Sequence, residues 1–204
     1  MKKILTALVL SFLLTATFTS CGNGNNESVT PDTSASEGNT SDNKTDIPDP
    51  LTLLNNVWAA YGDEEKFPAA GGDFSEENNK MDAPGKYSLE DAEAVDAALG
   101  FPQASVGKIE DAASLTHMMN ANTFTSAAYK VKEGEDVSAV INDIKTNILA
   151  RQWMCGFPDK LIIASTDNYV ISAFGHTEIM DTFKSKLTSV YSSVKIDVEE
   201  NIEG

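Results

Sequence analysis

The sequence predicts an α+β fold for residues 51–204, with a ferredoxin-like β-α-β-β-α-β core at 121–204 preceded by two or three helices at 51–120. Three patterns predict this fold. Apolar residues alternate from Phe124 to Val131, as in a strand. An apolar stripe at helical spacing follows Asp136, and two β-rich runs, a helix and a last strand come after it. This order is the split βαβ arrangement, in which two helices cover one face of a four-stranded antiparallel sheet.

Each core element is expected at a definite place in the chain. Asp136 caps the first helix, which reaches Trp153. Asp167-Asn168 joins two strands as a hairpin, and Thr177 caps the second helix. The expected ranges, in chain order, are 124–131, 137–153, 161–164, 169–174, 177–191 and 194–198.

The region before the core, residues 51–120, is predicted to be mainly helical. Apolar residues recur at helical spacing from Asp49 to Tyr61 and from 88 to 99, where Ser88 begins a sequence like a capping box. The same spacing predicts a third helix over 108–119. Residues 63–86 contain several Gly and Pro residues and predict an irregular loop, with Phe67 and Phe74 as anchors.

A four-stranded sheet with helices on one face leaves its other face to be explained. The preceding helices could cover that face and make a three-layer domain, or the face could be a binding surface. We expect coverage, because large exposed apolar patches are rare on monomers.

The chain begins with the pattern of an export signal. Two lysines, Lys2 and Lys3, precede an apolar run from Ile4 to Phe18. A membrane span needs about 20 mostly apolar residues, and this run is shorter and is interrupted by Thr and Ser. Residues 1–20 are therefore predicted to be a signal peptide that is removed on export.

The junction Phe18-Thr19-Ser20-Cys21-Gly22 resembles the lipobox of bacterial lipoproteins. This resemblance implies that Cys21 is acylated and becomes the mature N-terminus, anchored on the extracytoplasmic face of a bacterial membrane. Two or more acyl chains are enough for stable anchoring. Residues 21–50 are rich in Gly, Asn, Ser, Thr, Asp and Pro, which cannot form a core, so they predict a disordered tether.

The charge of the chain limits its partners. The formal net charge is −16, and it becomes more negative when Lys2 and Lys3 leave with the signal. Such a charge repels nucleic acid and anionic phospholipid, so we expect no nucleic-acid partner, whereas cations remain open. The chain has two cysteines. If Cys21 carries lipid, Cys155 has no intramolecular partner and no disulfide framework exists.

Two segments carry a resemblance to a known family. Residues 118–125, MMNANTFT, and residues 151–160, RQWMCGFPDK, together with the hairpin that follows, resemble a family of bacterial lipoproteins with a small domain of unknown function. The similarity covers the C-terminal half of the chain. It implies a signal, a tether and one small α+β domain, and it implies no activity.

Cys155 is the one candidate nucleophile. With His117 or His176 it could form a thiolate and its base, since a thiolate near neutral pH needs a neighbouring imidazole or positive charge. Nothing in the spacing brings these residues together, and a cysteine after an apolar helix end is typical of a packed residue. An envelope enzyme or thiol redox protein that uses Cys155 is therefore the alternative hypothesis.

The sequence assigns no cofactor and no metal site. The acidic runs at 63–65, 76–77 and 90–93 supply oxygen ligands that calcium favours, but none has EF-hand spacing. The two histidines do not form a zinc-ligand pair, and no phosphate-binding or dinucleotide-binding Gly-rich loop occurs. A calcium site assembled from separate loops stays open.

Trp153, Phe157 and Pro158 form an apolar segment between the first core helix and the hairpin. Core packing explains them if they are buried. If they are exposed, they would anchor a protein or peptide partner, because aromatic residues dominate interface energetics. Our leading hypothesis is a non-enzymatic, lipid-anchored module of the cell envelope that binds a protein, a small ligand or a cation.

Overall fold

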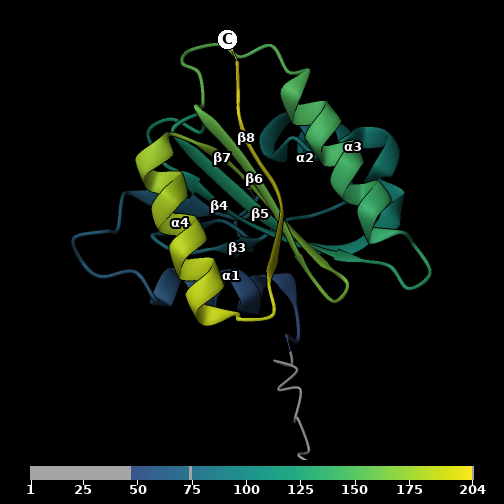
Figure 1. Ribbon diagram of the computed structural model, residues 1–204, viewed down its shortest axis with the longest axis horizontal. Coiled ribbons are helices and arrows are strands. Elements are labelled where there is room, and N and C mark those ends of the chain that lie inside the picture. Colours follow the sequence, from purple (N-terminus) through teal and green to yellow (C-terminus); the bar gives the residue numbers. More distant parts are fainter. Residues whose placement is uncertain (1–46, 74, 204) are drawn as a thin grey trace, which may run out of the picture. The chain divides into compact units, whose positions relative to one another are not determined.

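The computed structural model describes residues 47–73 and 75–203, in which one antiparallel sheet lies between two layers of helices (Figure 1). The helices of this part are α1 (Pro50–Ala59), α2 (Ala92–Leu99), α3 (Val137–Leu149) and α4 (Thr177–Val190), with a 3-10 turn at Gln103–Lys108. The strands are β1 (Ala69–Gly71), β2 (Lys80–Met81), β3 (Gly85–Lys86), β4 (Ile109–His117), β5 (Phe124–Val131), β6 (Lys160–Thr166), β7 (Tyr169–Gly175) and β8 (Lys195–Asn201). The α+β class is therefore confirmed.

The sheet runs in the order β2-β1-β4-β5-β7-β6-β8, and β3 pairs with β4. The predicted chain order is present as β5-α3-β6-β7-α4-β8. The ferredoxin-like arrangement of these elements is not confirmed, because β8 pairs with β6 at the far edge of the sheet. A ferredoxin-like sheet would need the last strand to pair with the other side of β5, but β4 pairs there instead.

The position of β8 also decides where the helices lie. β5 and β6 run parallel because both pair antiparallel with β7, and β7 and β8 run parallel in the opposite direction because both pair with β6. The connections through α3 and α4 move across the sheet in the same sense. Such crossovers are nearly always right-handed. Because β7 and β8 run opposite to β5 and β6, a right-handed connection places α4 on the face of the sheet opposite to α3.

Two hydrophobic cores confirm that arrangement. Side chains of α1 and α4 pack together on one face of the sheet, with Phe124 and Ile171 among the sheet residues. Side chains of α2 and α3 pack on the other face, with Tyr129 and Val170. Both faces are covered and the domain has three layers, but α3 and α4 do not share a face as the prediction required.

The predicted helix over 108–119 is wrong, because these residues form β4. Ile109, Ala112 and Leu115 recur at helical spacing, but in the strand Ala112 faces the α2–α3 core while Leu115 faces the α1–α4 core. A strand that is buried on both faces loses the alternation of polar and apolar residues. Periodicity alone therefore could not distinguish this strand from a helix.

Three smaller differences concern the predicted helical subregion and the first core helix. The expected loop at 63–86 contains β1, β2 and β3, while Phe74 lies outside the described residues. Asp91, and not Ser88, caps α2, since its carboxylate accepts the amide N–H groups of Glu93 and Ala94 at 3.0 Å. α3 ends at Leu149, four residues before Trp153.

The folded domain begins before Pro50. Ile47 is buried in the α1–α4 core, and its carbonyl accepts a 2.8 Å hydrogen bond from the hydroxyl of Tyr169. The end of the predicted tether is therefore packed, in contrast to the disordered tether expected to Pro50. The predicted signal peptide and Cys21 lie outside the described residues. No helix at 47–73 or 75–203 is long and apolar enough to cross a membrane.

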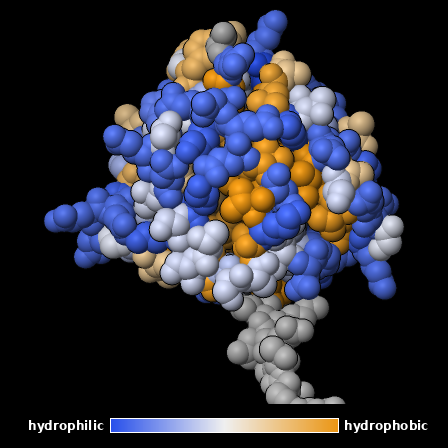
Figure 2. Space-filling view, in the orientation of Figure 1, coloured by the Kyte–Doolittle hydropathy of each residue, from blue (hydrophilic) through white to orange (hydrophobic). Residues whose placement is uncertain are grey.

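β8 forms one edge of the sheet and carries alternating charged residues. Glu199 pairs with Lys184 at 2.8 Å, and Glu200 pairs with Lys145 of α3. Figure 2, in the same orientation as Figure 1, shows hydrophilic side chains over most of the visible surface and a hydrophobic area near the middle of the view. Charged edge strands discourage pairing with another sheet.

Candidate functional site

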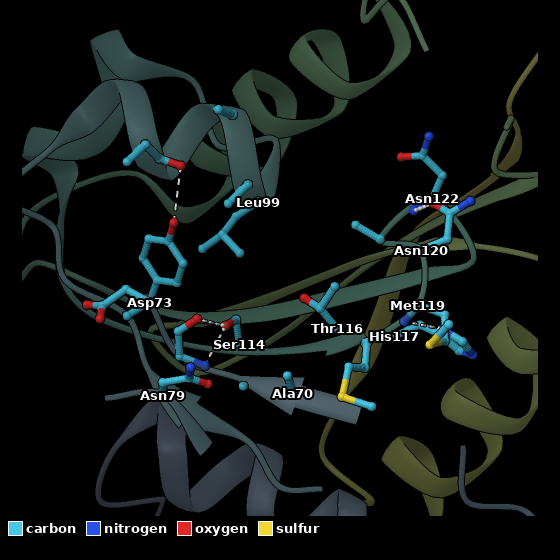
Figure 3. A pocket seen from close by; sticks show the side chains of 18 of the residues that line it. Ala70, Asp73, Asn79, Leu99, Ser114, Thr116, His117, Met119, Asn120 and Asn122 are labelled. Atoms are coloured by element: carbon cyan, nitrogen blue, oxygen red, sulfur yellow. Dashed lines mark hydrogen bonds between the residues drawn. The ribbon is translucent and has the colours of Figure 1, made fainter. Parts of the chain in front are cut away.

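A groove of 680 Å³ lies on the α2–α3 face of the sheet, near its β2 edge. Leu99 of α2 forms one wall, and Ser114 and Thr116 of β4 line the opposite side with Ala70 of β1 (Figure 3). The hydroxyl of Tyr87 donates to the carbonyl of Ala94 at 3.2 Å across the end of the groove. Ligand pockets of proteins have volumes of about 300–1,000 Å³, so the groove has the size of a small-molecule site.

Glycines bring the backbone segments of this wall close together. A Cβ atom at Gly71 would lie 2.3 Å from the amide nitrogen of Gly85, and one at Gly85 would lie 2.4 Å from the carbonyl oxygen of Asn78. Gly72 has a φ of 86°, in the left-handed region. The short strands β1 and β3 can therefore lie against β4 only because these positions carry no side chain.

Asp73 organises the loop that follows β1. Its carboxylate accepts hydrogen bonds from the amide of Ser75 at 2.9 Å, from the side chain of Asn78 at 2.9 Å and from the amide of Ser88 at 3.0 Å. Burial alone would raise the pKa of Asp73, but these donors and the Ser75 hydroxyl lower it from 3.8 to about 2. The hydrogen-bonding capacity of this carboxylate is therefore taken up by donors of the protein itself.

Replacing Asp73 by Asn should lower the free energy of unfolding at pH 7 by about 1–3 kcal/mol, because several donors lose their charged acceptor. The pKa of Asp73 is lower in the folded state than in the unfolded state, so this contribution is present above pH 4 and is lost as the pH falls towards 2. Urea unfolding between pH 7 and pH 2 should show the difference between wild type and variant disappear. Glu64→Gln, at an exposed position, is the control, and an equal effect there would contradict the prediction.

Large apolar side chains that face solvent gather at the rim of this groove. Three of them, Met81, Met118 and Met119, line it, and Met154 and Phe157 lie on the loop beside it. They are between 46% and 79% exposed. Methionine is usually buried, and exposed methionines are typical of surfaces that adapt to a ligand.

The loop at 150–159 is fastened to the turn between β4 and β5. The side-chain amide of Asn120 donates to the carbonyl of Cys155 at 3.0 Å, and that of Asn122 donates to the carbonyls of Met154 and Gly156 at 2.8 and 3.0 Å. The segments 118–125 and 151–160 are therefore in contact, and both contribute residues to the lining of the groove.

The predicted partner-binding residues are only partly exposed. Trp153 is half-buried, with its ring 5.1 Å from that of Phe174, and Pro158 is buried. Phe157 is 53% exposed. Trp153 does not line the groove itself but contacts two residues that do. These are Phe174 and Arg151, whose guanidinium lies 5.2 Å above the indole ring.

The candidate thiol site is not assembled. Cys155 is exposed, and neither histidine forms a hydrogen bond with it in the described part of the chain. The His117 ring stacks on Phe67 at 5.4 Å and its Nδ1 accepts the amide of Met119 at 3.2 Å. His176 is exposed at the start of α4, where Asp159 accepts the amide of Thr177 at 2.9 Å. In the described residues, therefore, no hydrogen bond joins Cys155 to an imidazole.

Across 47–73 and 75–203, the structure brings together no group of three or more His, Cys, Asp or Glu side chains that could hold a metal ion. The acidic side chains considered for calcium are exposed, with those at 63–65 and 76–77 on turns and those at 90–93 around the start of α2. At 63–65 the carboxylate of Glu65 pairs with Lys186 at 2.7 Å, and at 90–93 Asp91 is used as the cap of α2.

Sequence reasoning missed the groove because its walls come from short strands and from a helix predicted separately from them. One local signal was present in Met118-Met119, two adjacent apolar residues next to the Asn-rich turn. A strand end beside a polar turn rarely needs two large apolar side chains, and this pair could have indicated an exposed apolar rim.

Comparisons with known proteins return no match, whether the chain is compared with protein-family models, with curated proteins or with solved structures.

Proposed function

We propose that the protein is a lipoprotein of the bacterial cell envelope, anchored through Cys21, whose domain binds an apolar ligand in the groove between α2 and β4 without catalysing a reaction. The observation that carries this proposal is the gathering of exposed apolar side chains around a groove of small-molecule size. Apolar surface exposed in one place is typical of interaction sites. The lipid anchor rests on the lipobox resemblance at Cys21.

The groove is better suited to binding than to chemistry. Its polar groups are mostly used in internal hydrogen bonds: Ser114 accepts the amide of Gly72 at 3.0 Å, and Asp73 is saturated by donors. His117 also lines the groove, but its ring stacks on Phe67 and its Nδ1 accepts the amide of Met119, whereas general acid and base catalysis needs a titratable group free to reach a substrate proton. Apolar contact with small and flexible side chains is what the lining offers, and it suits a ligand that lacks many polar groups.

The binding half of the proposal is tested with a neutral apolar fluorophore, N-phenyl-1-naphthylamine, added to the full chain carrying Cys21→Ala. We expect the probe to bind with enhanced fluorescence, and Met118→Gln with Met119→Gln should weaken binding about tenfold, since this removes apolar contact worth 1–2 kcal/mol. Leu149→Gln, at an exposed apolar residue that does not line the groove, is the matched control.

Two results would overturn this assignment. Wild type could fail to enhance the probe fluorescence, or the control could weaken binding as much as the double methionine variant does. The anchoring half is tested by metabolic labelling with an alkyne palmitate analogue, in which Cys21→Ala should abolish both labelling and membrane fractionation. An unlabelled wild type would overturn the anchor.

A further inference from the structure

Arg151 is the only arginine of the chain, and it lines the groove. It follows the end of α3, and its guanidinium lies over the ring of Trp153. One N–H group donates to the carbonyl of Ala97 near the C-terminal end of α2. The side chain is thus held in place at the groove by an aromatic ring and by a backbone carbonyl.

Within 47–73 and 75–203, Arg151 forms no salt bridge, although the chain has twice as many acidic as basic residues. Most lysines of this part are paired with carboxylates, for example Lys108 with Asp143 at 2.6 Å. Asp96 acts on Arg151 only through space, and its own carboxylate accepts the side-chain amide of Asn147 at 2.8 Å. Burial lowers the pKa of Arg151, which is the effect expected of a cation removed from water without a carboxylate beside it.

Asp73, the carboxylate of the groove, does not act as the partner of Arg151. Asp73 lines the same groove, but its carboxylate accepts several hydrogen bonds from its own loop. Arginine has five N–H donors arranged to bind both oxygens of a carboxylate. The groove therefore combines apolar walls and an apolar rim with one cation that retains free donors.

We propose that the ligand of the groove is a free single-chain amphipathic carboxylate, whose apolar chain lies against the alanine and methionine side chains and whose head group binds Arg151. This inference rests on the proposed function and names its ligand class. The net charge of −16 opposes anion binding only weakly at physiological salt, where charges are screened over about 8 Å. The direct contact with Arg151 is much shorter than that.

The test compares dodecanoic acid with 1-dodecanol, which has the same chain and a neutral head. Both displace N-phenyl-1-naphthylamine from the full chain carrying Cys21→Ala, at pH 7. We expect the acid to bind about tenfold or more tightly than the alcohol, because a charge-assisted contact with arginine adds to chain burial. Arg151→Gln should remove this preference by weakening the acid far more than the alcohol, and continued binding of the alcohol and of the probe shows that the groove is intact.

Lys132→Gln is the matched control. Lys132 likewise donates to a backbone carbonyl, that of Gly107 at 2.7 Å, and lies away from the groove. The substitution removes the same unit of charge and should keep the preference for the acid. Arg151→Lys should keep part of it, since lysine supplies charge without the planar pair of donors.

The outcomes separate this inference from the proposed function. Equal affinities of the acid and the alcohol for wild type would overturn the carboxylate assignment alone, and so would an equal loss of both ligands in Arg151→Gln. Failure of both ligands and of the probe would overturn the proposed function as well. Dimerisation of wild type in sedimentation, abolished by Met118→Gln with Met119→Gln, would assign the groove to a second copy of the chain instead.

Discussion

Replacing Phe124 by Ala is expected to lower the free energy of unfolding by about 3–5 kcal/mol, the usual result of removing a buried aromatic ring. Phe124 is fully buried at the start of β5. Its ring lies 5.2 Å from that of Phe67 and 5.4 Å from that of Phe183 in α4. The substitution therefore leaves a cavity between the sheet and α4. Urea unfolding followed by circular dichroism measures the change.

The control is the same substitution at Phe157, which is 53% exposed and should change stability by no more than about 0.5 kcal/mol. Similar losses at the two positions would contradict the burial assigned to Phe124. A double-mutant cycle then tests the placement of the helices. Phe124→Leu and Phe183→Leu should couple by about 0.5–1.5 kcal/mol, whereas Phe124→Leu and Ile144→Val, on opposite faces, should add within about 0.5 kcal/mol.

Gly71→Ala is expected to destabilise the domain by about 2–4 kcal/mol, because the new methyl group would overlap backbone that cannot move aside. Its Cβ would lie 2.3 Å from the amide nitrogen of Gly85 and 2.5 Å from the carbonyl oxygen of Ala83. Separation of β1 from β3 would open the wall of the groove. We therefore expect weaker binding of N-phenyl-1-naphthylamine together with a lower midpoint of urea unfolding.

Gly107→Ala provides the comparison for this glycine. A Cβ atom at Gly107 has nothing within 4 Å, so its effect should stay within about 0.5 kcal/mol, with a small gain expected from the less flexible unfolded chain. If Gly71→Ala unfolded at the same urea concentration as Gly107→Ala, the close approach of β1 and β3 would be wrong.

Much of the C-terminal half could be predicted from local patterns. The strand at Phe124–Val131 and both core helices begin within a residue of their predicted positions, since each has a clear apolar period. The hairpin of β6 and β7 forms at Asp167-Asn168 as expected. The boundary of α3 at Leu149 was missed, because Trp153 continues the apolar pattern although the chain has already left the helix.

The candidate site could be predicted less well. Of the three residues selected from the sequence, Phe157 lies exposed beside the groove, while Trp153 supports Arg151 and Pro158 is buried. Arg151 stands in the segment 151–160, but nothing in a sequence indicates that a cation has no carboxylate partner. That property depends on which acidic residues the fold places around it.

By itself, the sequence determined the α+β class and the chain order of the last six elements, because both follow from periods of two and 3.6 residues within single segments. Only the tertiary structure decided that residues 109–117 form a strand, since burial on both faces removes their period. That strand pairs with β5, so β8 pairs with β6 and α4 lies opposite α3. Because β4 lines the groove, the groove depends on the pairing of β4 with β5. Pairing between distant segments is decided by the free energy of the whole core.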